Sequence, residues 1–314
     1  MIRLALVGCG EHAESGHAIP LARYQAEHPE EVALAAACDI EPERAQAFCK
    51  RFGFDSAYGD IGEMLSREKL DGCITVVPPE KIAQIGGLVL GQHIPCVVEK
   101  PLGSTPAEVS ALLASAASSG TPNMVSVNRR FMPFLNRALQ WAGDSGSIRY
   151  VHCTMARHAR SEPEFIWATA VHGIDTLRYI AGDVASFDVR ALKAGDGTAA
   201  WYAIDLHFKN GVEGRMDVLP TSGMLEETYD IFGEEYRVSV TCPFGSERGW
   251  SAYRGGILVT QERVPADMPE DVLNGCYDET AAFIRALRDG DNPKPSIGDV
   301  VPSIELCMSV ARKS

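Results

Sequence analysis

The chain has 314 residues, of which 46% are hydrophobic and 23% are charged, a composition typical of soluble globular enzymes. This length is sufficient for two domains of ordinary size and a substantial core. The formal net charge is −13 and the pI is about 5.1. A nucleic-acid partner is therefore not expected, because phosphate binding requires a basic surface.

Hydropathy and cysteine usage indicate a cytoplasmic protein. No apolar run approaches the ~18 residues of a membrane span, and no cleavage-type site follows residues 1–7, so we expect no signal peptide. The nine cysteines are scattered, odd in number and without a CxxC pair. This pattern favours reduced core cysteines over disulfides or a structural zinc site, and we predict no metal ligand.

The first part of the chain alternates between strand and helix patterns, beginning with a strand at 2–7 and a helix that extends to about Ala26. Such alternation is typical of a parallel sheet with crossover helices. We therefore predict a Rossmann dinucleotide-binding domain over residues 1–122. The other elements predicted in it are strands at 32–38, 71–77 and 94–98, and helices that begin near 42, 80 and 104.

Beyond residue 122 the pattern changes to helices followed by strands with alternating polarity. AsnGly at 210–211 is a hairpin signal. We predict an α+β domain over residues 123–314 with an open, mostly antiparallel sheet, so that the fold class is α/β + α+β. The predicted elements are helices at 132–142 and 169–181, strands at 201–208 and 227–240, and two helices from about 276 and at 299–312.

A possible phosphate-binding turn follows the first strand, where Gly8 and Gly10 begin a GxGxxA pattern that ends at Ala13. The glycines allow a close approach to a pyrophosphate, and the helix N-terminus supplies N–H groups. The pattern alone is weak, but Asp39 at the end of the second strand strengthens the dinucleotide interpretation. A carboxylate there accepts ribose hydroxyls and repels a 2′-phosphate, which favours NAD over NADP. Arg44 is either a phosphate ligand or a surface residue.

The strand at 94–98 ends in an unusual way, in Glu99-Lys100-Pro101. Burying a lysine at such a point is costly unless its charge is paired or serves in binding or catalysis. On spacing alone, a Glu–Lys surface turn stopped by proline is an equally good interpretation.

Several segments resemble the Gfo/Idh/MocA family, the relatives of glucose–fructose oxidoreductase and inositol dehydrogenase. The resemblance runs nearly end to end, and EKP, NRRF and HxxD in this order are a specific combination. It implies a Rossmann domain followed by an α+β domain with an open, largely antiparallel sheet. The segments are LVGCGEHA (6–13), CDIEPERAQAF (38–48), EKPLG (99–103), VNRRFMP (127–133), VHGIDTLRYIAGD (171–183) and YDETAAFIRALRDG (277–290).

The resemblance also implies roles for individual residues. Lys100 is expected to contact the substrate hydroxyl and to help place the nicotinamide, with a Lys100–Pro101 peptide that is often cis in the family. One of Arg129 and Arg130 is expected to tie the two domains. The implied cofactor contacts are Gly8, Gly10, Glu11, His12, Ala13, Asp39, Val77, Pro78, Glu99, Lys100 and Asn128, and the implied substrate contacts are Asp175, Asn128, Arg129 and Arg157.

His172 and Asp175 lie one turn apart on a predicted helix and therefore share a face. A histidine is a natural acceptor for a hydroxyl proton as hydride leaves the same carbon. We predict that His172 is the acid/base and that Asp175 holds a neighbouring hydroxyl. A helix-capping or core histidine is the alternative interpretation.

Two positions depart from the family pattern. Ala168 stands four residues before His172, where family dehydrogenases usually carry an aspartate, and Ile82 stands where the family often has a histidine. Glu162, Glu164 or Arg160 could substitute for the aspartate. The sequence therefore supports cofactor binding more strongly than turnover.

We predict an NAD(P)-dependent oxidoreductase that acts on a secondary hydroxyl or ketone of a sugar, inositol or related polyol. The expected assembly is a homodimer or homotetramer whose open sheet face forms the subunit interface. Two alternatives stay open. One is a non-catalytic dinucleotide-binding sensor of the same fold, and the other is an enzyme that uses bound NAD transiently in an elimination or glycoside hydrolysis.

Overall fold

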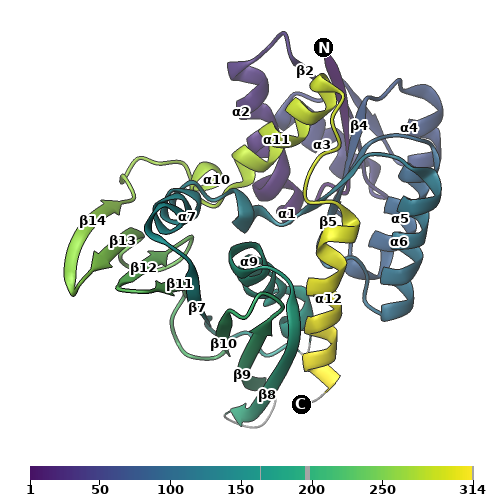
Figure 1. The fold of residues 1–314 in the computed structure, drawn as a ribbon. Coiled ribbons are helices and arrows are strands. Elements are labelled where there is room, and N and C mark those ends of the chain that lie inside the picture. Colours follow the sequence, from purple (N-terminus) through teal and green to yellow (C-terminus); the bar gives the residue numbers. More distant parts are fainter. Residues whose placement is uncertain (163, 195–198, 313–314) are drawn as a thin grey trace. The chain divides into compact units, whose positions relative to one another are not determined.

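The computed structural model of the chain describes residues 1–162, 164–194 and 199–312 (Figure 1). The chain divides into two compact units. The first unit contains Met1–Val127 and Cys276–Pro302, and the second contains Asn128–Gly275 and the residues from Ser303 onward.

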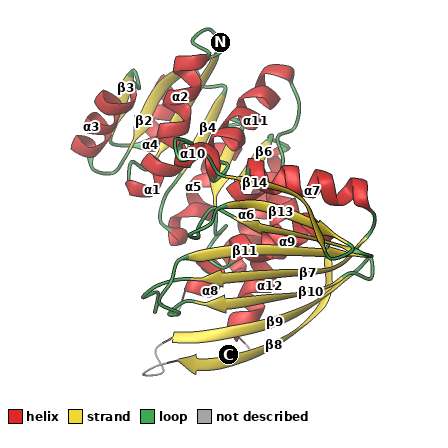
Figure 2. Ribbon diagram, turned by 90° about the vertical axis from the view of Figure 1, so that its left-hand side faces the viewer, coloured by secondary structure: helices red, strands yellow, loops and turns green. Residues whose placement is uncertain are grey.

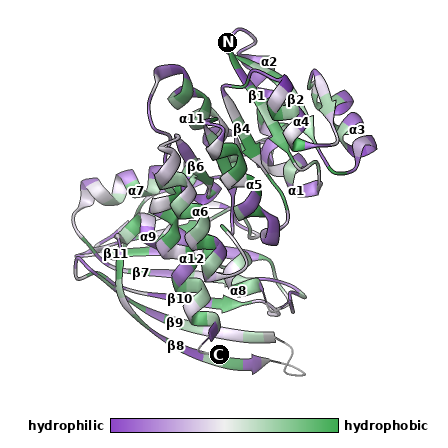
Figure 3. Cartoon of the chain, turned by 90° about the vertical axis from the view of Figure 1, so that its right-hand side faces the viewer, coloured by the Kyte–Doolittle hydropathy of each residue, from purple (hydrophilic) through white to green (hydrophobic). Residues whose placement is uncertain are grey.

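The first unit is built on a parallel six-stranded sheet in the order β3-β2-β1-β4-β5-β6. The strand order reverses between β1 and β4, which is where open α/β sheets bind ligands, outside the carboxyl ends of the strands. The hydrophobic colouring of β1 and β4 in Figure 3 matches their position in the middle of the sheet. The strands are β1 (Ile2–Val7), β2 (Val32–Cys38), β3 (Ser56–Tyr58), β4 (Gly72–Thr75), β5 (Cys96–Glu99) and β6 (Asn123–Ser126).

Helices connect these strands and cover the sheet. The first helical segment is interrupted by a π-helical turn, Glu14–Ala18, between α1 and α2. Thr105 and Glu108 form a capping box at the start of α6, as a Ser/Thr-rich helix start favours. The helices are α1 (Glu11–Ala13), α2 (Ile19–Glu27), α3 (Pro42–Phe52), α4 (Ile61–Arg67), α5 (Pro79–Gly91), α6 (Pro106–Ser119), α11 (Cys276–Asp289) and α12 (Ile297–Arg312), the last of which continues into the second unit.

The second unit is built on an eight-stranded sheet in the order β14-β13-β12-β11-β7-β10-β9-β8. Neighbouring strands are antiparallel except β7 and β10, which pair in parallel. The strands are β7 (Ile148–Ala156), β8 (Val184–Ala194), β9 (Ala199–Phe208), β10 (Glu213–Leu219), β11 (Glu226–Gly233), β12 (Tyr236–Thr241), β13 (Gly249–Arg254) and β14 (Ile257–Arg263).

One face of this sheet packs against helices. α9 contacts β7 and β10, and α7 contacts β12 and β13 (Figure 2). Alternate strand residues such as Val151, Met216 and Tyr229 are buried on this face. The helices of the unit are a 3-10 turn at Asn128–Phe131, α7 (Pro133–Ser145), α8 (Phe165–Ala168), α9 (Val171–Ala181) and α10 (Glu270–Leu273).

The predicted fold class is confirmed, and so is the hairpin at 210–211, where Gly211 has φ +84° in the turn between β9 and β10. The predicted segment 227–240 is two strands rather than one, because Glu235 adopts φ +61° in a tight turn between them. The strands β3, β6, β7, β8, β10, β13 and β14 have no counterpart among the predicted elements.

The division into units differs from the two contiguous domains expected at 1–122 and 123–314. β6 pairs with β5, so the first unit continues to Val127. α11 also belongs to this unit, because Phe283 and Leu287 pack where Gly72 leaves space on β4.

All nine cysteines are buried, and none is in a disulfide in the part of the chain that the structure describes. Among the same residues, no helix combines the length and the apolar character needed to cross a bilayer.

Candidate active site

The glycine turn after β1 has a shape that only glycine allows. Gly8 adopts φ +92°, and a Cβ there would lie 1.9 Å from the carbonyl oxygen of Val76. A Cβ on Gly10 would meet nothing within 4 Å, so the backbone is open to an approaching group. Gly10 is also the residue before α1, whose first turn presents main-chain N–H groups. These features fit the pyrophosphate of a dinucleotide.

Asp39 joins the end of β2 to this turn. Its Oδ2 accepts a hydrogen bond from the Cys9 main-chain N–H at 2.8 Å, and its Oδ1 accepts one from Glu41 at 2.9 Å. Arg44 lies 3.2 Å from the same Oδ1 and also pairs with Glu41. Arg44 is therefore the ion-pair partner of Asp39, a contact that the sequence analysis did not predict.

Glu99, the last residue of β5, is buried and holds three hydrogen bonds. Its Oε1 lies 3.0 Å from Nε2 of His12 and 2.9 Å from Nε2 of His17, and its Oε2 accepts from the Lys100 main-chain N–H at 2.9 Å. Burial raises the pKa of Glu99, but the charge and hydrogen bonds of His12, with His17 and Lys100, outweigh it and hold this pKa well below its usual value. The Lys100–Pro101 peptide is cis, as expected.

The connection from β4 to α5 completes this edge of the parallel sheet. The Val76 N–H bonds the Val7 carbonyl, and a Cβ on Gly8 would lie 3.4 Å from Cγ1 of Val77. Ile82 is buried in α5, so the family's histidine position is occupied here by a core residue. The first unit therefore brings the predicted cofactor residues of β1, β2, β4 and β5 to the carboxyl ends of their strands.

In the second unit, a buried carboxylate holds two of the predicted substrate residues. Glu227 on β11 accepts from Arg129 at 2.9 Å, from Tyr229 at 2.7 Å, and from Arg157. Both guanidinium groups also lie over the ring of Phe244. Burial raises the pKa of Glu227, but the two arginines outweigh it and lower this pKa to about 2.

Arg129 and Arg157 are thus buried and engaged within their own unit, and their contact with substrate stays a prediction. The Nδ2 of Asn128 donates to the Asn274 carbonyl at 2.8 Å.

The sequence did contain a signal for the buried carboxylate of Glu227. Glu227 alternates with Tyr229 and Ile231 on the covered face, and a charge in a core register requires partners.

Asp175 on α9 is saturated by protein donors. Arg130 donates to both of its oxygens, at 2.7 and 2.8 Å, and Ser303 donates to Oδ1 at 2.7 Å. The carboxylate is 1% exposed. The structure therefore gives Asp175 an ion-pair role that the sequence analysis missed, and the predicted hydrogen bond to a substrate hydroxyl stays a prediction.

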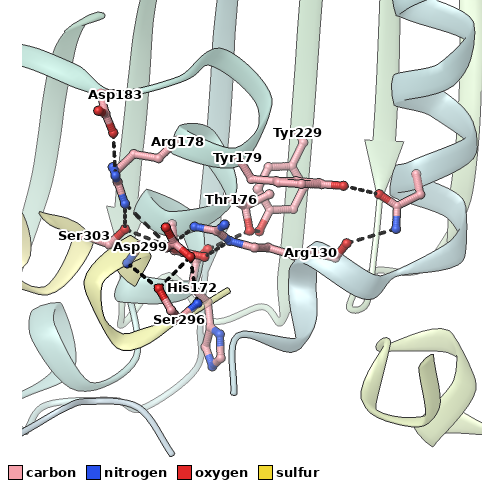
Figure 4. A network of polar contacts seen from close by, with 12 residues as sticks. Arg130, His172, Thr176, Arg178, Tyr179, Asp183, Tyr229, Ser296, Asp299 and Ser303 are labelled. Atoms are coloured by element: carbon pink, nitrogen blue, oxygen red, sulfur yellow. Dashed lines mark hydrogen bonds and ion pairs between the residues drawn. The ribbon is translucent and has the colours of Figure 1, made fainter. Parts of the chain in front are cut away.

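His172 lies one turn earlier on the same helix, where its main-chain carbonyl accepts from the hydroxyl of Thr176 at 2.7 Å. Figure 4 shows its imidazole directed away from Arg130 and Thr176. The helix thus presents the imidazole on a different side from the Arg130 ion pair.

The segment before α9 lacks the family's aspartate, since Ala168 is the last residue of α8. Glu162, one candidate substitute, is held by Arg160, which also donates to Oγ1 of Thr169 at 3.2 Å. Arg160 in turn lies over the ring of Phe165. The Glu162 carboxylate is therefore engaged by a cation of its own segment.

Comparison with known proteins identifies a family that matches the first part of the chain. Residues 2–128 match a family described as an oxidoreductase family with an NAD-binding Rossmann fold, GFO_IDH_MocA. The matched region ends one residue after the first segment of the first unit.

Relatives with established names cover nearly the whole chain. A D-apiose dehydrogenase of Paraburkholderia graminis is 26% identical over 330 residues, covering 96% of this chain and 84% of the relative. A 4-carboxy-2-hydroxymuconate-6-semialdehyde dehydrogenase of a Sphingobium species is 24% identical over 317 residues, with 96% and 95% covered.

A solved structure shares the fold over the same extent. An oxidoreductase from Agrobacterium radiobacter, in complex with NAD+, L-tartaric acid and magnesium, superposes with a TM-score of 0.82 at 18% identity. The match covers 99% of this chain and 96% of that one.

Proposed function

The chain belongs to the Gfo/Idh/MocA oxidoreductase family and is an NAD(P)-dependent dehydrogenase, and on that premise we propose its substrate and the roles of its residues. The proposed reaction is hydride transfer between NAD and a secondary hydroxyl or ketone carbon of a sugar or related polyol. One observation carries the proposal. Glu99 fixes the main chain of Lys100 at the carboxyl end of β5, the sheet edge where the glycine turn and Asp39 also lie.

NAD, when bound, supplies the hydride acceptor. Gly8, Gly10 and the first turn of α1 would hold its pyrophosphate, and Asp39 its ribose. In the oxidation direction, the Lys100 ammonium stabilises negative charge on the substrate oxygen as the C–H bond breaks. His172 accepts the hydroxyl proton, so that the carbonyl forms without a free alkoxide. In reduction, the same two groups supply the charge and the proton.

The substrate class follows from the relatives' names. One relative acts on D-apiose, a sugar, and another on a carboxylated semialdehyde. The test is a panel of sugars, polyols and carboxylated aldehydes, with NADH formation measured by absorbance. NADH formation that saturates with one compound supports the proposal. Binding of NAD without turnover of any compound would support the sensor instead, a second candidate that Ala168 favours.

The proposed location is the cytoplasm. The buried, unbridged cysteines support a reducing compartment.

Cofactor choice gives the first prediction. The unmodified protein is expected to bind NADH more tightly than NADPH, because the Asp39 carboxylate repels a 2′-phosphate. Asp39→Ala should reduce this preference by about tenfold or more, since a hydrogen bond to a charged group contributes roughly 1.5–3 kcal/mol. Fluorescence titration with both cofactors measures the ratio.

Arg44→Ala is the matched variant for this titration. It removes the cation beside Asp39 and should strengthen the preference for NADH. Equal or tighter NADPH binding by the unmodified protein would contradict the assignment.

The proposed assembly is a homo-oligomer formed through the uncovered sheet face. The ladder register places Tyr150 opposite Phe232, Phe232 opposite Arg237, Arg237 opposite Tyr253, and Tyr253 opposite Leu258. The rings of Tyr150 and Phe232 lie 6.0 Å apart, and Leu258 is 46% exposed. A largely apolar row across five strands supports an interface here, because large exposed apolar patches are normally covered.

We expect the unmodified protein to be at least dimeric at micromolar concentration. The double variant Tyr253→Asp with Leu258→Asp should be monomeric, because it places charges in the apolar row. Multi-angle light scattering measures both. Leu88→Asp, which changes an exposed leucine of α5 in the first unit, is the control and should leave the mass unchanged. A monomeric unmodified protein would refute the proposed assembly.

A further inference from the structure

We infer that His17 is a positioning residue for Lys100, acting through the Glu99 carboxylate. Nothing in the motifs around the glycine turn or EKP assigns a task to this histidine. The inference deepens the proposed function and rests on it, because the residue that His17 positions is the proposed catalytic lysine.

His17 owes its direction to the π-helical turn Glu14–Ala18. A π-turn adds one residue to a helix and so changes the side to which the next side chains point; such turns occur frequently at functional sites. Here the turn directs the His17 imidazole inward, where the side chain is only 3% exposed. A polar ring in that position requires a partner, and the partner is Oε1 of Glu99 at 2.9 Å.

The protonation states in this contact follow from the carboxylate. The pKa of Glu99 lies well below its usual value, against the effect of burial, so the group is an anion that only accepts hydrogen bonds. Nε2 of His17 must therefore carry its proton and donate. His12 also donates to Oε1, but its side chain is 58% exposed, whereas His17 is enclosed. His17 is therefore the more rigid of the two supports.

The other carboxylate oxygen connects this support to Lys100. Ladder pairing between β5 and β6 ends at Glu99 with Ser126. The Lys100 main-chain N–H is the next donor along the chain, and it bonds Oε2 of Glu99 at 2.9 Å. The side-chain conformation of Glu99 thus sets the orientation of the peptide from which the Lys100 side chain starts.

The test compares two substitutions of His17. Leucine has a similar volume and no donor, whereas the amide nitrogen of glutamine can replace the Nε2 donor. The two pairs of variants are His17→Leu with His17→Gln, and His28→Leu with the unmodified protein. His28 is an exposed histidine at the end of α2, so His28→Leu makes the same chemical change away from Glu99.

The first readout is the Lys100 amide itself, in the protein without substrate. Selective 15N-lysine labelling gives few resonances, and the Lys100→Arg variant identifies the one from Lys100. His17→Leu should accelerate hydrogen exchange of this amide by about tenfold or more, because its acceptor is no longer held. His17→Gln and His28→Leu should leave it unchanged. The lysines are Lys50, Lys69, Lys81, Lys100, Lys193, Lys209, Lys294 and Lys313.

The second readout is kinetic, and it separates the positioning of Lys100 from a general loss of structure or of NAD binding. His17→Leu should lower kcat by about 10- to 100-fold, the effect of misplacing a reacting group by roughly 1 Å. The Kd for NAD should change less than about threefold, because the glycine turn is intact, and His17→Gln should restore most of kcat. If His17→Leu does not fold, His17→Asn replaces it, because its shorter amide does not reach Glu99.

Unchanged exchange at Lys100 in the folded donor-free variant would overturn the inference. So would a kcat loss that glutamine does not restore. If the unmodified protein turns over no compound of the panel, the proposed function fails, while the exchange measurement still decides whether His17 holds the Lys100 main chain.

Discussion

Replacing His172 with alanine is expected to lower kcat by about 100- to 10,000-fold, the usual contribution of a placed acid/base. NAD affinity should hardly change, because His172 belongs to α9 of the second unit, whereas the glycine turn and Asp39 belong to the first. Steady-state kinetics on the substrate found by the panel, with a separate NAD titration, measure the two effects.

Lys100→Ala should reduce kcat further than His172→Ala does. The ammonium stabilises the developing charge on the substrate oxygen, and its loss removes the electrostatic part of catalysis. His28→Ala is the control, since this exposed histidine lies at the end of α2. A His172→Ala enzyme that turns over substrate at the unmodified rate would mean that the proton acceptor lies elsewhere.

The largest effect on stability is expected at Glu227. This side chain is 0% exposed and is the shared counter-ion of Arg129 and Arg157. Glu227→Ala leaves two buried guanidinium groups without that anion, and breaking a buried ion pair typically costs about 3–5 kcal/mol. The free energy of unfolding of the second unit should fall by about that amount.

Tryptophan fluorescence in urea measures this unit alone, because all four tryptophans lie in it: Trp141, Trp167, Trp201 and Trp250. Glu213→Ala, at a half-exposed glutamate of β10, is the matched control and should change stability by less than about 0.5 kcal/mol. A Glu227→Ala protein as stable as this control would contradict the prediction.

The Glu227 carboxylate also makes the free energy of unfolding depend on pH. The folded pKa of Glu227 is about 2, below its usual 4.5. A group with a lowered folded pKa contributes stability that is complete above the unfolded pKa and lost as pH falls through the folded value. The contribution should therefore decline between pH 4.5 and 2. Urea midpoints over that range should fall less steeply in Glu227→Gln than in the unmodified protein.

The sequence predicted four strands of the parallel sheet, β1, β2, β4 and β5, because each is a short apolar run flanked by helix signals. It did worse where apolar periodicity is weak. β14 carries exposed residues along most of its length, and β3 has only three residues, so neither produces a pattern. The return of α11 to the first unit depends on packing against β4, which no local signal specifies.

The candidate site shows the same division. Motif residues such as Gly8, Asp39 and Lys100 could be found because the chemistry requires those residue types at those places. The contacts between distant residues could not be predicted, because His17 and Glu99 are 82 residues apart and Arg130 and Asp175 are 45 apart. Such pairs are set by tertiary packing rather than by local spacing.

The discontinuous first unit has a consequence for engineering chimeric enzymes. The chain passes from one unit to the other after Val127, after Gly275 and after Pro302, so no single cut separates them. A chimera that takes only residues 1–127 from a relative would pair a foreign β4 with the native α11, whose Phe283 and Leu287 side chains are fitted to Gly72. Exchange of the cofactor-binding half between family members should therefore succeed only when all of these junctions are moved together.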